Sequence, residues 1–195
     1  ALIAGTGDLP LALLARLPVR PLICAMDGFR PAITPDVTFR IEHLGSFLAD
    51  LKTRGNTEVC MAGAVKRPSI DPAAIDAATQ PLVPRIADAI AKGDDGALRT
   101  IIAIFEEAGL AVKAAHEIAP DLLPDAGVLT RAPITFDHRQ DAVLAEQTLT
   151  EMGRADVGKS CIVRGGRVLA REGQAGTDAM IARFGPESDP LWAAV

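Results

Sequence analysis

Short apolar runs and amphipathic stretches follow one another along the first 120 or so residues. The apolar runs that we expect to form strands occupy residues 2–4, 22–26, 38–41, 57–62 and 111–114. Stretches with helical spacing occupy residues 9–17, 45–53, 72–78, 82–92 and 94–110. Residues 2–4 and 22–26 are apolar throughout, which is typical of parallel strands buried on both faces, whereas the expected strand at residues 38–41 is weaker because it contains polar residues. The alternation therefore predicts an α/β fold with a Rossmann-like, doubly wound, mostly parallel sheet.

The pattern changes after several chain breakers, among them Pro120, Pro124 and Pro133. We expect a boundary near residues 129–133, with a first domain at residues 1–130 and a second, smaller α+β domain at residues 131–195. In the second domain the pattern predicts a helix at residues 137–152 and another opening at residues 176–178. Between them lie two apolar runs joined by Gly165 and Gly166, which is a hairpin signal. Residues 185–195 resemble a tail.

Composition and charge exclude several classes of function. The chain has 195 residues, of which 49% are hydrophobic and 23% charged, so a globular core is expected. Its net charge of -5 argues against a nucleic-acid partner, because duplex binding usually needs a concentrated basic face. Aromatic residues make up only 4%, which makes a stacking platform for bases or sugars improbable.

Three cysteines, Cys24, Cys60 and Cys161, are odd in number and each lies in an apolar run. This pattern predicts reduced, buried thiols in a cytosolic protein rather than a disulfide framework or a zinc site. No apolar run approaches the roughly 20 residues of a membrane span, and the first residues lack the basic flank of a signal peptide. We therefore expect a protein that is not embedded in a membrane.

The turn Gly5-Thr6-Gly7 follows the first expected strand, where backbone amides at a helix start can hold a phosphate. It resembles the start of a dinucleotide fingerprint, but Pro10 stands where the third glycine belongs. Asp27, at the end of the second strand, could accept a hydrogen bond from a ribose hydroxyl. Two interpretations are open, phosphate binding and a turn whose glycines are required only sterically. An NAD-dependent oxidoreductase is the weakest alternative.

Lys66 and Arg67 follow the fourth strand, and in a doubly wound sheet the carboxyl ends of strands line the ligand crevice. They would face the same cleft as Gly5 and Gly7. An arginine there can hold a phosphate through two hydrogen bonds, while a lysine acts as a point charge. The alternative is two solvated charges at a strand end.

Carboxylates and histidines give further candidates for chemistry. Asp94 and Asp95 lie at an expected helix start, either as caps or as oxygen ligands for Mg²⁺. Asp178 presents the same choice. His116, followed by a glutamate, stands at an expected strand end as acid, base or substrate contact, or as a structural histidine. The two other histidines, His43 and His138, are expected to be structural.

Five segments in order resemble one family, the LpxI-type UDP-2,3-diacylglucosamine pyrophosphatases. Residues 3–10 read Ile-Ala-Gly-Thr-Gly-Asp-Leu-Pro and residues 62–68 read Ala-Gly-Ala-Val-Lys-Arg-Pro, as in that family. Residues 92–99 read Lys-Gly-Asp-Asp-Gly-Ala-Leu-Arg, with Ala97 at a usual leucine, and are followed by the matches at residues 115–117 and 176–180. The resemblance extends over nearly the whole chain.

The resemblance implies a cytoplasmic enzyme of lipid A biosynthesis, with peripheral contact with the inner membrane and homo-oligomerisation left open. It would hydrolyse UDP-2,3-diacylglucosamine to UMP and 2,3-diacylglucosamine 1-phosphate (lipid X), with Mg²⁺ or Mn²⁺. The implied metal ligands are Asp94 and Asp178. The implied substrate-binding residues are Gly5, Thr6, Gly7, Gly63, Lys66, Arg67, Asp95, His116 and Thr177.

Two departures from the family pattern change what is expected of this chain. Ala175 stands where the family usually has glutamate. No segment after Asp178 matches the family's Asp-Leu-Pro-x-Ile-Gly, whose aspartate the resemblance makes catalytic, so the catalytic residue is left unknown. We expect the second domain to be incomplete, with the chain cut short, or else a natural variant that binds nucleotide sugar or lipid phosphate without catalysis.

Overall fold

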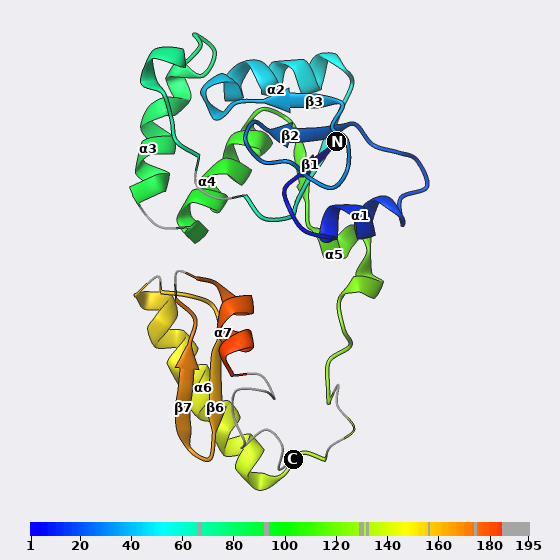
Figure 1. Cartoon of the computed structure of the whole chain (residues 1–195). Coiled ribbons are helices and arrows are strands. Elements are labelled where there is room, and N and C mark those ends of the chain that lie inside the picture. The colour runs from blue at the N-terminus through cyan, green and yellow to red at the C-terminus, as the bar shows by residue number, and fades with distance from the viewer. Residues whose placement is uncertain are drawn as a thin grey trace. The chain divides into compact units, whose positions relative to one another are not determined.

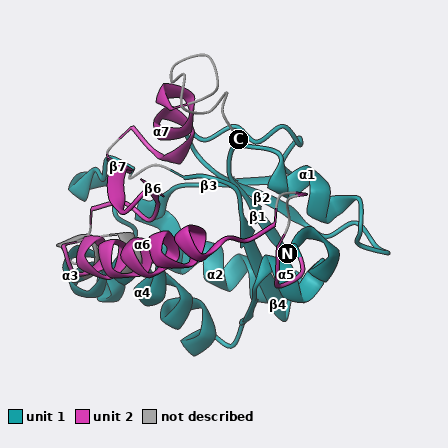
Figure 2. Cartoon of the chain, turned by 90° about the horizontal axis from the view of Figure 1, so that it is seen from below, with its two compact units in different colours: residues 1–124 teal, residues 125–195 magenta. Residues whose placement is uncertain are grey.

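The computed structural model describes residues 1–184 except residues 66, 67, 92, 93, 129, 130, 132, 156 and 174, and only the backbone of residues 89–91, 94 and 95. The chain forms two compact units, which divide between Pro124 and Asp125 (Figure 2). The sequence pattern places the boundary near residues 129–133, partly outside the described residues.

A five-stranded parallel sheet forms the centre of the first unit (Figure 1). Its strands are β1 (Leu2–Ala4), β2 (Ile23–Met26), β3 (Val37–Phe39), β4 (Glu58–Ala62) and β5 (Ala111–Lys113). They lie in the order β3-β2-β1-β4-β5, and every neighbouring pair is parallel. The Rossmann-like, doubly wound sheet expected from the apolar runs is confirmed.

Helices cover both faces of this sheet, because successive side chains of the central strands β1 and β2 point to opposite faces and both sets are apolar. The helices are α1 (Leu9–Leu14), α2 (Leu44–Thr53), α3 (Val83–Ala91), α4 (Asp94–Glu107) and α5 (Ala115–Ile118). One core joins Cys24 and Phe39 of the sheet to α2, α3 and α4. The other core joins Ile23 and Cys60 to α1 and the segment around α5.

The helix expected over residues 72–78 is wrong in extent. Within this stretch the structure has a single 3₁₀ turn at Pro72–Ala74. Three further 3₁₀ turns of the described residues lie at Ile41–His43, Gln80–Leu82 and Pro120–Leu122. The Asp71 carboxylate accepts from the Ala73 N–H at 2.9 Å, and the Asp76 carboxylate accepts from the Thr79 N–H at 2.7 Å. Such side chain to backbone bonds compete with helix hydrogen bonds, which explains why this alanine-rich stretch is irregular.

The second unit contains α6 (Phe136–Arg154), the antiparallel pair β6 (Cys161–Arg164) and β7 (Arg167–Arg171), and α7 (Thr177–Arg183). The expected hairpin is confirmed: Gly165 and Gly166 both have positive φ, at 58° and 70°, as a two-residue turn of this kind requires. The Asp141 carboxylate of α6 accepts from both glycine N–H groups, at 2.9 and 2.7 Å. This contact fixes the hairpin tip on the helix.

All three cysteines are free thiols. Cys24 and Cys60 are buried in the sheet, whereas Cys161 is only half-buried, which corrects the expectation that all three would be buried. Burial raises the pKa of the Cys24 thiol to about 11, so this sulfur stays protonated and unreactive at neutral pH. Within the described residues, no helix is both long and apolar enough to cross a membrane.

Gly153 lies near the end of α6, where an added Cβ would meet nothing within 4 Å. We expect Gly153→Ala to raise the free energy of unfolding of the second unit by about 0.5 kcal/mol, because alanine has the higher helix propensity and restricts the unfolded chain. Thermal unfolding followed by circular dichroism measures this change. A lower melting temperature would contradict the open surroundings of Gly153.

Candidate functional site at the carboxyl edge of the parallel sheet

The carboxyl ends of β1 and β4 meet at the point where the strand order reverses direction. From β1 the chain continues into α1 on one face of the sheet, and from β4 it leads to α3 and α4 on the other. In open α/β sheets, ligands bind in the crevice outside the carboxyl ends of the strands at such a point. The loops after β1 and β4 therefore line the expected ligand crevice.

These two loops are hydrogen-bonded directly to each other. The Thr6 N–H donates to the Ala64 carbonyl oxygen and the Ala64 N–H donates back to the Thr6 carbonyl oxygen, both at 2.9 Å. The Thr6 hydroxyl also donates to the Ala64 oxygen, at 3.1 Å, and the Gly5 N–H donates to the Ala62 oxygen at 2.7 Å. The amides of Gly5 and Thr6 are thus used inside the protein and are not directed at a ligand.

The glycines at this contact allow the two backbones to approach. A Cβ on Gly5 would lie 2.6 Å from the Ala64 oxygen, and one on Gly63 would lie 2.7 Å from the Thr6 oxygen. Gly63 also has a φ of +92°, which other residues rarely adopt. Gly5 and Gly63 thus have the steric role that the sequence offered as the alternative to phosphate binding. Gly7, exposed and with open space around it, is the part of the turn that a ligand can reach.

Several sequence candidates at this edge have side chains that are not described. Lys66 and Arg67 lie outside the described residues, and of Asp94 and Asp95 only the backbone, in the first turn of α4, is described. α4 leads into β5, which is parallel to β4, so it must run back from the carboxyl edge of the sheet. The topology therefore brings the start of α4 to the edge that also carries Gly7 and Gly63.

A charged network that the sequence pattern did not reveal lies at the end of β3. Arg40 donates from Nε and Nη2 to the two carboxylate oxygens of Glu42, at 3.2 and 3.0 Å. Glu42 is only 3% exposed and accepts a third bond, from the Asp71 N–H at 2.9 Å. These hydrogen bonds, that from Arg40 first, lower the pKa of Glu42 to about 2. The spacing Arg-Ile-Glu after a strand was the only signal for this pair, and it is weak.

The segment after β4 is fixed to the start of α2 near this network. Thr79, which is buried, accepts from the Gly45 N–H through its hydroxyl at 2.8 Å. Nε2 of His43 lies 3.1 Å from the Ala74 carbonyl oxygen. The backbones approach so closely that a Cβ on Gly45 would lie 2.2 Å from the Ala78 oxygen. The loop that leaves the crevice is therefore held firmly at its far end.

The end of β5 carries His116, which is exposed in the short helix α5. The neighbouring Glu117 carboxylate accepts from the Ala114 N–H at 2.6 Å and so caps the N-terminus of this helix. Because β5 is paired with β4, His116 follows the strand next to the Gly63 loop. Its imidazole forms no hydrogen bond within the described part of the chain and is open to a ligand.

Thr177 and Asp178 belong to the second unit, at the start of α7. The Thr177 hydroxyl lies 3.3 Å from that of Ser160, which donates to the Glu172 carboxylate at 2.8 Å. Hydrogen bonds from the Lys159 N–H and from Ser160 lower the pKa of Glu172, so this carboxylate is ionised. Asp178 is exposed beside this cluster, and its carboxylate is open to solvent.

The described residues do not by themselves make a metal site. Among them, no three His, Cys, Asp or Glu side chains gather closely enough to hold an ion. Of the two predicted ligands, Asp178 stands exposed and the side chain of Asp94 is not described. The donors among the described residues therefore do not form a complete metal site.

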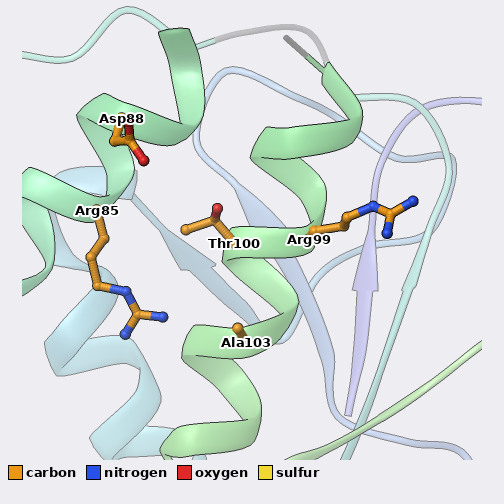
Figure 3. A pocket seen from close by; sticks show the side chains of 5 residues that line it. All are labelled: Arg85, Asp88, Arg99, Thr100 and Ala103. Atoms are coloured by element: carbon orange, nitrogen blue, oxygen red, sulfur yellow. The ribbon is translucent and has the colours of Figure 1, made fainter. Parts of the chain in front are cut away.

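A hollow of about 260 Å³ lies between α3 and α4. It is lined by Arg85, Asp88, Arg99, Thr100 and Ala103. Figure 3 shows Asp88, Arg85 and Thr100 on the facing sides of the two helices, while the Arg99 guanidinium points the other way. Arg85 is also paired with Glu107 through both terminal nitrogens. The lining residues that are described all belong to α3 and α4, and none belongs to the loops after β1 and β4.

Comparison with known proteins gives the family. Residues 1–122 match the model of the LpxI N-terminal domain and residues 125–190 match that of the LpxI C-terminal domain. The chain belongs to the LpxI family. A relative named UDP-2,3-diacylglucosamine pyrophosphatase LpxI, from Caulobacter vibrioides, is 33% identical over 188 residues. That alignment covers 93% of this chain and 67% of the relative.

The two LpxI domains coincide with the two compact units of the structure. The crevice with Gly5, Gly7 and Gly63, the charged network of Arg40 and Glu42, and His116 all lie in the LpxI N-terminal domain. Thr177 and Asp178 lie in the LpxI C-terminal domain. The resemblance to LpxI stated from the sequence motifs is confirmed.

Proposed function

We propose that this protein hydrolyses the pyrophosphate bond of UDP-2,3-diacylglucosamine in lipid A biosynthesis. The oxygen of a water molecule bonds to one phosphorus, and the bridging oxygen leaves with the other. The products are UMP and 2,3-diacylglucosamine 1-phosphate. Since the substrate carries two acyl chains, we place the reaction at the cytoplasmic face of the inner membrane.

The observation that carries this proposal is the match to the Caulobacter vibrioides pyrophosphatase, which extends through both units. The geometry of the first unit supports it. Its parallel sheet has a crevice between β1 and β4 at the place where such sheets bind nucleotides. Gly7 is exposed next to the contact between the two loops, and exposed His116 follows β5, the strand beside β4, so this edge offers a backbone and a side-chain donor for a diphosphate.

The test uses the natural gene product, expressed from its own start codon to its own stop codon. Incubated with UDP-2,3-diacylglucosamine, it should release UMP and the sugar phosphate in equal amounts, measured by chromatography. Absence of UMP at high protein concentration would reject the hydrolase and favour a protein that only binds the nucleotide sugar. Oxidation or reduction of added NAD(H) would instead support an oxidoreductase.

We also propose that hydrolysis requires Mg²⁺ or Mn²⁺ and that Asp178 is one of the ligands. A carboxylate oxygen is the ligand that these ions prefer, and Asp178 is exposed in the first turn of α7. We expect EDTA to abolish UMP release and added Mg²⁺ or Mn²⁺ to restore it. Asp178→Asn should reduce the rate by about tenfold or more and weaken Mn²⁺ binding in a titration.

A matched control is Asp137→Asn, since Asp137 is also exposed in the first turn of a helix of the same unit. This change removes the same charge from a helix start and should leave both the rate and Mn²⁺ binding unchanged. Equal effects of the two substitutions would show that only helix stability had been altered. Full activity in EDTA would contradict the metal requirement.

A further inference from the structure

The ends of β2 and β3 place two charged side chains next to each other at the carboxyl edge. Met26 and Phe39 are the last paired residues of the two strands, so Asp27 and Arg40 follow at matching positions. The Asp27 N–H donates to the Phe39 carbonyl oxygen at 2.7 Å and extends the pairing by one residue. Adjacent strands are about 4.8 Å apart, which brings both side chains within reach of one small ligand.

The Arg40 guanidinium is held in a fixed orientation and is still accessible. Nε and Nη2 donate to Glu42, which is buried and is further fixed by the Asp71 N–H. The Arg40 side chain is 45% exposed, and Nη1 takes no part in the contact with Glu42. A buried, ionised carboxylate behind a half-exposed guanidinium is an arrangement that directs the remaining N–H donors outward.

The position of this pair relative to the crevice suggests what it could bind. In the order β3-β2-β1-β4-β5, Asp27 lies one strand and Arg40 two strands from the loop after β1, or about 5 and 10 Å. In doubly wound folds the phosphates lie at the end of the first strand, and an acidic residue after the second accepts from the ribose. A nucleoside whose diphosphate lies in the crevice would therefore extend over Asp27 towards Arg40.

We infer that Asp27 and Arg40 form the nucleoside subsite of this protein, with Asp27 accepting hydrogen bonds from the ribose hydroxyls and Arg40 donating from Nη1 to the C4 carbonyl oxygen of uracil. This inference rests on the proposed function, which supplies a uridine nucleotide. Uracil has an acceptor oxygen at C4, whereas cytosine carries an amino donor there, which cannot accept a hydrogen bond from Arg40. Arg40 thereby selects uridine over cytidine, and Glu42 is the positioning residue behind it.

The experiment measures binding of UMP and CMP to the purified protein by calorimetry. Arg40→Gln should weaken UMP binding by about tenfold to a hundredfold and leave CMP binding nearly unchanged, so the preference for UMP is lost. Asp27→Asn should weaken both nucleotides equally. Asp27→Asn should not change the affinity for 2′,3′-dideoxyuridine monophosphate, because this nucleotide has no ribose hydroxyls that could donate to Asp27.

Arg20→Gln is the matched control, because Arg20 forms the same two-bond contact with Asp36, at the opposite end of β2. It should leave the ratio of UMP to CMP affinity unchanged, and circular dichroism should show all variants folded. An unchanged ratio in Arg40→Gln, or absence of UMP binding to the unaltered protein, would overturn the subsite. A protein that shows the Arg40-dependent preference but releases no UMP from the diacylated substrate would retain the subsite and reject the proposed hydrolysis.

Discussion

Gly63→Ala is expected to lower the free energy of unfolding of the first unit by about 3 kcal/mol and to abolish activity. Two costs add at this position. A residue with a side chain at a φ of +92° costs about 1–2 kcal/mol. The new Cβ would lie 2.7 Å from the Thr6 oxygen, and overpacking of this kind costs about 1–3 kcal/mol. The loops after β1 and β4 would have to separate, and the crevice would change shape.

Alanine substitutions at two other glycines measure the backbone cost and the contact cost separately. Gly28→Ala introduces only the unfavourable backbone conformation, at a φ of +84° with nothing within 4 Å, and should cost about 1 kcal/mol. Gly5→Ala introduces only the close contact, 2.6 Å from the Ala64 oxygen, and should cost about 2 kcal/mol. Urea unfolding followed by circular dichroism gives all three values. If Gly63→Ala cost no more than Gly28→Ala, the direct contact between the loops would be contradicted.

Glu42→Ala should have the second largest effect, a loss of about 2–3 kcal/mol in the free energy of unfolding. It leaves the Asp71 N–H without its acceptor and the Arg40 guanidinium without its two hydrogen bonds. Because Arg40 is half-exposed and can be hydrated, the loss should stay below that for a fully buried ion pair. UMP affinity should fall as well, since Arg40 is no longer held in position.

The same carboxylate predicts how stability depends on pH. The pKa of Glu42 is about 2 in the folded protein against an ordinary value of 4.5, so the unfolded chain binds its proton more readily. Its contribution is therefore fully present above about pH 4.5 and is lost as the pH falls towards 2. Glu42→Gln should flatten the loss of stability over this range in acid unfolding experiments. Other carboxylates with lowered pKa values, such as Asp36 and Glu107, keep some of the slope. An identical acid profile in Glu42→Gln would contradict the ionised, hydrogen-bonded state.

The sequence predicted well those elements whose pattern of apolar residues follows from their own burial and does not depend on which segment packs against them. β1 and β2 are continuously apolar, and β4 is apolar after Glu58, because both faces of the sheet are covered, and this pattern is visible without knowing the neighbours. The hairpin of the second unit was also predicted, since Gly165-Gly166 satisfies a local backbone requirement. The family motifs were local as well, and their order along the chain was enough to indicate LpxI.

The features that the sequence did not predict depend on contacts between segments that are distant in the chain. Residues 72–78 have a helical composition, but the segment is bound through Thr79 to the start of α2, which is distant in sequence. Glu42 was overlooked because a glutamate after a strand is ordinarily solvated, and only packing of the Asp71 loop against it produces burial. Gly5 was considered for phosphate, whereas its amide is bonded to Ala62 of another strand.

By itself, then, the sequence determined the order of strands and helices, the doubly wound sheet and the LpxI family, because periodic burial and turn chemistry act over a few residues. Only the tertiary structure decided which of the predicted site residues serve the fold and which are open to a ligand. Gly5, Thr6 and Gly63 join two loops, whereas Gly7, Asp27, Arg40 and His116 are accessible at the strand ends. The physical reason is that a backbone amide or a carboxylate can form only a few hydrogen bonds. Whether a segment distant in sequence already uses them depends on how the sheet is assembled.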